Sequence, residues 1–462
     1  MDSPPLTVAF VAGEPSGDRQ GAALLTALRE CAAPRTVRAW GIGGANLAAA
    51  GTELLHDSGP WAFIGLANAL RLLPGILRAL ADMKRALLKN PPDALVCIDS
   101  GAFNGRLARW VKRRGLCPVF YFFPPGSWRR TAGTRGNLAE ITDRIVTPFP
   151  WSAENLKQSG ADARFVGHPL LDLVHPALPA QAFYERFGLD PLRPLVALLP
   201  GSRATEIVHI LPALVGAAGE ITRRIPGVQF ALALGDGAAR PLVEDILRRA
   251  QGQGGGAARV PLLMHQAGDK LASLAQTTLT PPVLATNEGL ILPAPRERAE
   301  DAAPAPAQAP PAPLVICEGL TYDVLARSDL VITKSGTATL EAAILQKPMI
   351  IVYRGSAWMA LEWKLRKPTL GVTHIGMPNI LAQERLFPEL IQDEATPEAI
   401  SELAVAMLLE PERLLRLKEK LADLVHTNLG EPGGIARTAA LLYETATGTA
   451  ADKPGPLGNT RA

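Results

Sequence analysis

The chain has 462 residues, of which 47% are apolar and 20% charged, with a formal net charge of +3. This length suits two large domains or three of average size, and the apolar and charged fractions exclude a disordered or fibrous chain. A net charge this small over such a length does not indicate a nucleic-acid-binding protein. No uninterrupted apolar run reaches the roughly 18 residues that a membrane-spanning helix needs.

The cysteines and the first residues indicate the compartment. The four cysteines form no CxxC pair and lack the Cys/His spacing of a zinc site, so we expect free thiols in a reducing compartment. The opening segment MDSPPLTVAFVAGEPSGD runs from two prolines into a strand-like stretch and lacks the three parts of a signal peptide. We therefore expect a cytoplasmic protein, which leaves room for binding at a membrane surface.

Short runs rich in Val, Ile and Leu alternate with segments of helical period along most of the chain. This pattern is typical of an α/β fold, in which parallel strands buried on both faces are linked by crossover helices. The predicted strands cover residues 6–11, 37–40, 94–98, 119–123, 144–146 and 164–166 in the first half, and 195–199, 229–234, 330–333 and 349–352 in the second.

Two successive series of this kind predict two doubly wound, Rossmann-like domains that face a central cleft. We place them at residues 1–183 and 184–450, because prolines punctuate the stretch between them, and we expect a flexible tail at 451–462. A Pro/Ala-rich stretch near 277–313 has no apolar periodicity and reads as a surface insertion. A ligand is expected in the cleft, at the carboxyl ends of the strands.

The first strand is followed by the turn VAGEPSGD and then by a helix. Glycines in such a turn permit close backbone approach, and the amides at the start of the helix point toward whatever binds there. The pattern is not GxGxxG, so it does not favour a dinucleotide. The alternative interpretation is a tight turn with a Ser or Asp capping the helix.

Two further turns of this kind lie in the second half. In LLPGSRATEI, Arg203 stands beside the amides that open a helix, and its fork suits a diphosphate, although a surface capping turn is the alternative. In ITKSGTATLEAAI, small residues open a helix and Glu341 follows one and a half turns later, where a carboxylate can accept hydrogen bonds from both hydroxyls of a ribose. Two anion-binding turns in one domain favour a nucleotide diphosphate.

Asp99 follows a buried apolar run in VCIDSGAFN, at the expected carboxyl end of a strand. Two interpretations stay open for it. An aspartate at this place often caps the next helix. It can also act as a general base that faces the cleft.

Eight segments in this order resemble the lipid A disaccharide synthases, a family of inverting glycosyltransferases with the glycosyltransferase B fold. Together they span most of the chain. The segments are VAGEPSGD, GIGG, CID, FVGHP, LPGSR, SGTATLE, KPMIIVYR and MPNILAQERLFPELIQ.

The resemblance implies a reaction. A 2,3-diacylglucosamine unit would pass from its UDP-linked form to the 6-hydroxyl of 2,3-diacylglucosamine 1-phosphate, giving a β-1,6-linked disaccharide and UDP. It implies no metal and no cofactor, and no nucleic acid as a partner. Peripheral binding at the inner face of the bacterial inner membrane is expected as well, and a homodimer is left open.

The resemblance also assigns roles to individual residues. Asp99 would be the base for the acceptor hydroxyl, Arg203 would hold the diphosphate, and Glu341 would bind the ribose. The other donor contacts would be Gly201, Ser202, Ser335, Gly336, Thr337 and Asn379, and the turn facing the acceptor side of the cleft would supply Glu14, Ser16 and Asp18.

This chain departs from the family pattern in two places. The family's IDAPDFN reads IDSGAFN here, so that Ala102 replaces an acidic residue, and its SPSVWAWR reads PPGSWRR at residues 124–130. Both departures bear on the identity of the acceptor more than on nucleotide binding.

The stretch from Trp61 to Leu80 is apolar at most positions. One interpretation is an ordinary core helix broken near Pro74. Because the implied substrates carry acyl chains, we expect instead an exposed apolar patch with basic neighbours. Its candidate residues are Trp61, Phe63, Leu66, Leu70 and Leu73.

Two other functions stay open at this point. The first is a soluble isomerase acting on UDP-N-acetylglucosamine on the same two-domain fold, which would need further acid/base residues and no acyl groove. The second is a catalytically silent relative that only binds nucleotide, suggested by Ala102 and the altered segment at 124–130.

Overall fold

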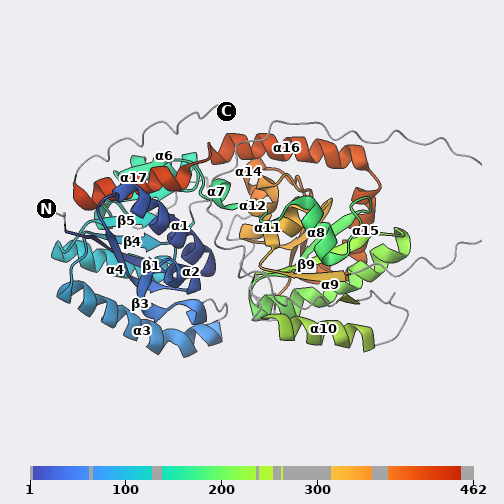
Figure 1. Ribbon diagram of the computed structural model, residues 1–462, viewed down its shortest axis with the longest axis horizontal. Coiled ribbons are helices and arrows are strands. Elements are labelled where there is room, and N and C mark those ends of the chain that lie inside the picture. The colour runs from blue at the N-terminus through green and yellow to red at the C-terminus, as the bar shows by residue number, and fades with distance from the viewer. Residues whose placement is uncertain are drawn as a thin grey trace, which may run out of the picture.

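The computed structural model describes residues 4–61, 66–126, 138–235, 239–252, 262–263, 314–355 and 373–448. They form two lobes, each built on one sheet with helices on its faces (Figure 1). The α/β class and the pair of doubly wound sheets predicted from the sequence are confirmed. The predicted insertion at 277–313 and the tail at 451–462 lie outside the described residues.

The first lobe contains a seven-stranded parallel sheet with the strand order β3-β2-β1-β4-β5-β6-β7. Its strands are β1 (Leu6–Ala12), β2 (Val37–Gly43), β3 (Thr52–Asp57), β4 (Ala94–Ile98), β5 (Val119–Phe122), β6 (Arg144–Thr147) and β7 (Ala163–Phe165). Its helices are α1 (Pro15–Ala32), α2 (Ala45–Ala49), α3 (Leu66–Lys89), α4 (Gly101–Arg114), α5 (Leu138–Ile141) and α6 (Pro150–Gln158). The short helix α7 (Leu170–Leu173) follows, and it contacts both α12 and α17.

The second lobe contains a parallel sheet with the order β10-β11-β9-β8-β12-β13-β14. Its strands are β8 (Leu195–Leu199), β9 (Gln229–Leu234), β10 (Leu262–Leu263), β11 (Leu314–Glu318), β12 (Leu330–Lys334), β13 (Met349–Tyr353) and β14 (Glu389–Ile391). Its helices are α8 (Ala180–Phe187), α9 (Ala204–Arg224), α10 (Arg240–Gly252), α11 (Thr321–Arg327), α12 (Thr337–Ile344), α14 (Met377–Ala382), α15 (Pro397–Leu408) and α16 (Pro411–Leu429).

Each sheet has one point at which the strand order reverses direction. In the first lobe β1 and β4 are neighbours, with β2 and β3 on one side and β5, β6 and β7 on the other. In the second lobe the corresponding neighbours are β8 and β12. Because loops diverge at such a point, it opens a crevice at the carboxyl ends of the strands, where α/β proteins bind ligands.

All ten strands predicted from the sequence are present. Among the strands of the described residues, four were missed: β3, β10, β11 and β14. Strand β3 lies at a sheet edge and its residues alternate between buried and more exposed, so it lacks the continuous apolar run of a central strand. Strand β11 follows directly on the Pro/Ala-rich stretch, which hid its apolar run LVICE.

The alternative interpretation of the 61–80 stretch included a break near Pro74, and this break is absent, because α3 continues through Pro74 to Lys89. A proline inside a helix removes one hydrogen bond, and this loss is tolerated where the rest of the helix is well packed. Ala79 and Met83 of α3 are fully buried in the first lobe, whereas Leu73 and Leu77 are exposed.

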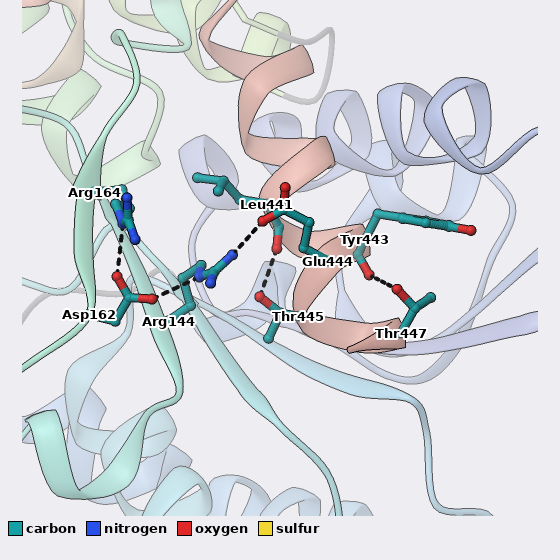
Figure 2. A network of polar contacts seen from close by, with 8 residues as sticks. All are labelled: Arg144, Asp162, Arg164, Leu441, Tyr443, Glu444, Thr445 and Thr447. Atoms are coloured by element: carbon teal, nitrogen blue, oxygen red, sulfur yellow. Dashed lines mark hydrogen bonds and ion pairs between the residues drawn. The ribbon is translucent and has the colours of Figure 1, made fainter. Parts of the chain in front are cut away.

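The last described helix, α17 (Gly434–Thr447), returns to the first lobe and packs against α1 (Figure 1). Its Leu442 is buried beside strand residues of the first sheet. Figure 2 shows the polar link near the same, C-terminal end of the helix, where the Arg144 guanidinium of β6 lies 2.9 Å from Glu444 and 3.0 Å from Asp162. Chain position alone placed this helix in the second domain at 184–450, whereas its packing joins it to the first sheet.

Candidate active site

The two crevices face each other, and two ion pairs cross between the lobes. Arg19 of α1 lies 2.5 Å from Glu341 of α12, measured between Nη2 and Oε1. In the opposite sense, Nη2 of Arg203 in the second lobe lies 3.7 Å from Oε2 of Glu14 in the first. Glu14 and Arg203, which the sequence assigned to opposite sides of a cleft, therefore lie within ion-pair distance of each other.

The turns after β1 and β4 are in direct contact. A side chain at Gly13 would collide with the hydroxyl of Ser100, so only glycine allows these two turns to approach so closely. Glu14 occupies the N-cap position of α1 without capping the helix through its side chain, which leaves its carboxylate for Arg203. Ser16 is half-buried in the first turn of α1.

Asp99 does not cap α4. The N-cap residue is Ser100, whose side chain makes no capping hydrogen bond, so the capping interpretation of Asp99 is wrong. Both residues have a φ of about 47°, a left-handed conformation that aspartate adopts more readily than most side chains. The backbone carbonyl of Asp99 accepts hydrogen bonds from Asn104 Nδ2 at 3.0 Å and the Tyr121 hydroxyl at 2.7 Å, which hold the turn in place.

The surroundings of Asp99 raise the pKa of its carboxyl group. Burial raises the pKa of Asp99 to about 6, the nearby Glu14 carboxylate adds to the rise, and a hydrogen bond from the backbone N–H of Ser100 opposes it. A carboxyl with a pKa near neutrality in a cleft is a candidate acid or base.

The PGSR turn at the end of β8 brings charges of both signs together. Gly201 has a φ of 119°, and a side chain there would collide with Glu206. Arg203 is the N-cap residue of α9, with its side chain 19% exposed and its Nε without a hydrogen-bond partner among the described residues. Ser202 is exposed and donates its backbone N–H to Glu206 at 3.2 Å.

The SGT turn follows β12 and opens α12. Gly336 is the N-cap residue, with a φ of 150° that favours glycine, and Thr337 is exposed at the first position of the helix. The Ser335 hydroxyl donates a 2.6 Å hydrogen bond to the carbonyl of Ile375, so that it anchors the loop before α14. The first amides of α12 have no acceptor within the helix, and the small residues of this turn add little side-chain bulk of their own.

Glu341 is almost fully buried between the lobes. Its Oε1 accepts the Arg19 ion pair and a 3.1 Å hydrogen bond from the Tyr322 hydroxyl. Burial raises the pKa of Tyr322, with a further contribution from the Glu341 carboxylate, so the phenol stays a hydrogen-bond donor at neutral pH. A buried carboxylate with donors already directed at it is well placed to accept hydrogen bonds from hydroxyl groups.

Two predicted site residues have other partners. Asp18 is buried, and its carboxylate accepts the backbone N–H groups of Gly44, Asn46 and Leu47 at the start of α2. Asn379 is fully buried and holds the segment before β14 through Phe387 and Glu389. Both side chains organise the turns around the cleft.

Replacing Asp18 with alanine is therefore expected to lower the free energy of unfolding by about 3 kcal/mol, because it strands buried N–H groups that now bond to a charged acceptor. Urea unfolding would measure this loss. Any activity that remains should scale with the folded fraction. A variant of full stability that has lost its activity would instead give Asp18 a direct role in the cleft.

The candidate acyl-binding residues are only partly described. Trp61 is half-buried and packs on Phe103, with ring centroids 5.4 Å apart, whereas Leu73 is 43% exposed. Phe63 and the side chains of Leu66 and Leu70 lie outside the described residues. Within the described part of the chain, α9 alone is long and apolar enough to cross a membrane, and half of it is buried in the second lobe, as in a core helix.

Several residues of the site were missed from the sequence. Arg19 and Tyr322 meet Glu341, and Glu206 and Lys334 lie beside Arg203. Lys334 and Glu206 stand within or next to the two turns for which the sequence predicts anion binding, and this proximity was the available signal. No local pattern marked Arg19, because its partner is 322 residues away along the chain.

The comparisons with known proteins decide the family. The family model described as lipid-A-disaccharide synthetase matches residues 8–253 and 293–440. The chain belongs to this family. It is 33% identical to the lipid-A-disaccharide synthase of Syntrophus aciditrophicus over 94% of this chain and 96% of the relative, and 33% identical to that of Geobacter metallireducens over 96% and 98%. The family assignment makes the chain a hexosyltransferase of lipid A disaccharide synthesis.

Solved structures share the fold at low sequence identity. MnaA of S. aureus in a structure with UDP has a TM-score of 0.55 at 10% identity, covering 98% of this chain and all of that one. The UDP-GlcNAc 2-epimerase of Neisseria meningitidis, solved with UDP-GlcNAc, has a TM-score of 0.53 at 12% identity, covering 97% and 100%. These likenesses confirm the two-domain fold, while the family match favours the synthase over the isomerase considered above.

Proposed function

We propose that the protein transfers a 2,3-diacylglucosamine unit from UDP to the 6-hydroxyl of 2,3-diacylglucosamine 1-phosphate. The observation that carries this proposal is the meeting of two turns across the cleft. The adjoining turns of Glu14 and Asp99 belong to one lobe and the Arg203 turn belongs to the other, and the Glu14–Arg203 ion pair joins the two lobes at 3.7 Å. This contact supports the proposal that the base and the diphosphate-binding group act on one bound substrate pair, as a direct displacement requires.

In the proposed mechanism, the second lobe holds the donor. Glu341 exchanges Arg19 for the ribose hydroxyls, and the Arg203 guanidinium binds the diphosphate together with the amides that open α9 and α12. When the bond between the sugar C1 and the diphosphate breaks, its electron pair leaves with UDP. Arg203 and the two helix ends stabilise this new charge.

The first lobe supplies the base. The Asp99 carboxylate removes the proton of the acceptor 6-hydroxyl as the oxygen attacks C1 on the face opposite the leaving group. The new O–C1 bond forms while the C1–diphosphate bond breaks, so the sugar configuration inverts to β. Asp99 ends protonated and returns its proton to solvent after the products leave.

We also propose that the protein works in the cytoplasm at the surface of the inner membrane, where acylated substrates are found. The exposed Leu73 and Leu77 lie one helical turn apart on α3, next to the exposed Arg78. Apolar side chains beside a cation suit a peripheral contact with an anionic lipid surface.

One incubation tests the proposed function. The purified protein is given the UDP-linked diacyl sugar and its 1-phosphate acceptor, and the products are separated by mass spectrometry. We expect a disaccharide 1-phosphate and one UDP for each disaccharide formed. Conversion of UDP-N-acetylglucosamine to an epimer would support the isomerase instead, and UDP binding without any turnover would support the silent relative.

A further inference from the structure

Lys334 is the last residue of β12 and lies next to Arg203 across the second switch point. Its Nζ is 2.9 Å from Oε1 of Glu206, and Nη1 of Arg203 lies 3.4 Å from the same oxygen. The Lys334 side chain is 20% exposed and that of Arg203 is 19% exposed, so water screens neither cation fully. Two cations from two different strand ends therefore converge on one carboxylate.

The position of Glu206 is fixed by a local hydrogen bond at the start of α9. It occupies the third position of α9 and accepts the backbone N–H of Ser202, the residue before the N-cap, at 3.2 Å. From this fixed place it also holds Lys334 and Arg203 side by side. A side chain at Gly336 would lie 3.0 Å from the Lys334 Nζ, which places the ammonium group directly over the turn that opens α12.

The set of groups around Glu206 Oε1 and Oε2 resembles what a phosphate group needs. A guanidinium, an ammonium and a backbone N–H all donate to this one carboxylate. A diphosphate presents more oxygens and more charge than a carboxylate, and it gains a further negative charge when it leaves the sugar. In the described part of the chain, Glu14 and Glu206 are the carboxylates that form ion pairs with these cations, and they balance Arg203 and Lys334 in charge.

We propose that Lys334 is a second cation that binds the diphosphate of the donor, held beside Arg203 by Glu206. This inference rests on the proposed function and adds a residue to its donor site. Lys334 would contact the phosphate oxygens from the β12 side while Arg203 contacts them from the β8 side. Its contribution is specific to the diphosphate and leaves recognition of the uridine unchanged.

The test compares Lys334→Met with Lys334→Arg. UDP affinity is measured by calorimetry and uridine binding by ligand-observed NMR. Loss of one charged contact is expected to weaken UDP binding about 10- to 100-fold in Lys334→Met, with uridine binding unchanged. Lys334→Arg keeps the charge and should restore UDP affinity to within a few-fold of the parent. Lys420→Met removes the same charge from an exposed position of α16 and should have no effect.

The outcomes separate this inference from the function on which it rests. Equal UDP affinity of Lys334→Met and the parent, in a parent that binds UDP and makes disaccharide, overturns the role of Lys334 alone. Equal losses of UDP and uridine binding mean a general structural defect and also overturn it. A parent that binds no UDP overturns the proposed function and this inference together.

Discussion

Asp99→Asn is expected to lower the rate of sugar transfer about 10²- to 10⁴-fold, the usual contribution of a general base. The amide keeps the size and hydrogen bonding of the side chain but cannot take up the proton of the acceptor hydroxyl. UDP affinity should stay within a few-fold of the parent, because the donor contacts proposed above come from the other lobe. Single-turnover transfer and UDP titration on the same preparation measure both effects.

The thermal stability of Asp99→Asn is measured beside that of the parent, to show that any loss of transfer does not come from unfolding. Asparagine tolerates the left-handed backbone of Asp99, where φ is 47°, so the turn should remain intact. The pKa of Asp99 is about 6 in the folded protein, above its value in the unfolded chain, so the folded state binds this proton more tightly. The protonated carboxyl therefore stabilises the fold, and this stabilisation is lost as the pH rises through 6. Above pH 6 the variant should therefore unfold at the same temperature as the parent or higher. Near-parental transfer by Asp99→Asn would remove Asp99 as the base.

Arg203→Ala is expected to raise the barrier to transfer by about 2.7 to 4 kcal/mol, by analogy with the removal of one preorganised donor to a developing negative charge. This corresponds to a rate loss of about 10²- to 10³-fold. UDP affinity should fall as well, because the guanidinium lies beside the helix start that we assign to the diphosphate.

Arg416→Ala is a suitable control, since it removes the same charge from an exposed position on α16. It should leave both the transfer rate and UDP affinity unchanged. Parental turnover and UDP binding in folded Arg203→Ala protein would rule out the role assigned to Arg203.

Much of the fold could be predicted because central strands of parallel sheets are buried on both faces and leave continuous apolar runs. β4 and β8, which are buried along their whole length, were predicted to the residue. Edge strands such as β3 carry no such run, and the return of α17 to the first lobe depends on tertiary contacts like that between Arg144 and Glu444. A short sequence pattern does not indicate which distant part of the fold a helix will pack against.

Candidate site residues could be predicted from the sequence where a strand ends in a marked turn. They could not be predicted where a side chain contacts a residue that is distant along the chain. The turns of Glu14, Asp99 and Arg203 were found because their sequences mark them. Asp18 and Asn379 belong to equally marked segments, yet burial directs their side chains to nearby backbone and side-chain groups. The Arg19–Glu341 pair joins elements from two domains, which no short motif can indicate.

The central claim is that the ionised carboxylate of Asp99 takes the proton of the acceptor hydroxyl. The most direct test is the pH dependence of single-turnover transfer in the parent and in Asp99→Asn, both saturated with substrates. Because the pKa of Asp99 is about 6, the rate of the parent should be constant above pH 6 and should fall tenfold for each pH unit below it. The residual rate of the variant should not show this fall at acid pH. The second ionisation of a phosphomonoester such as the acceptor's also falls near pH 6. An acid limb shared by both proteins would therefore belong to the substrate and would contradict the assignment of Asp99.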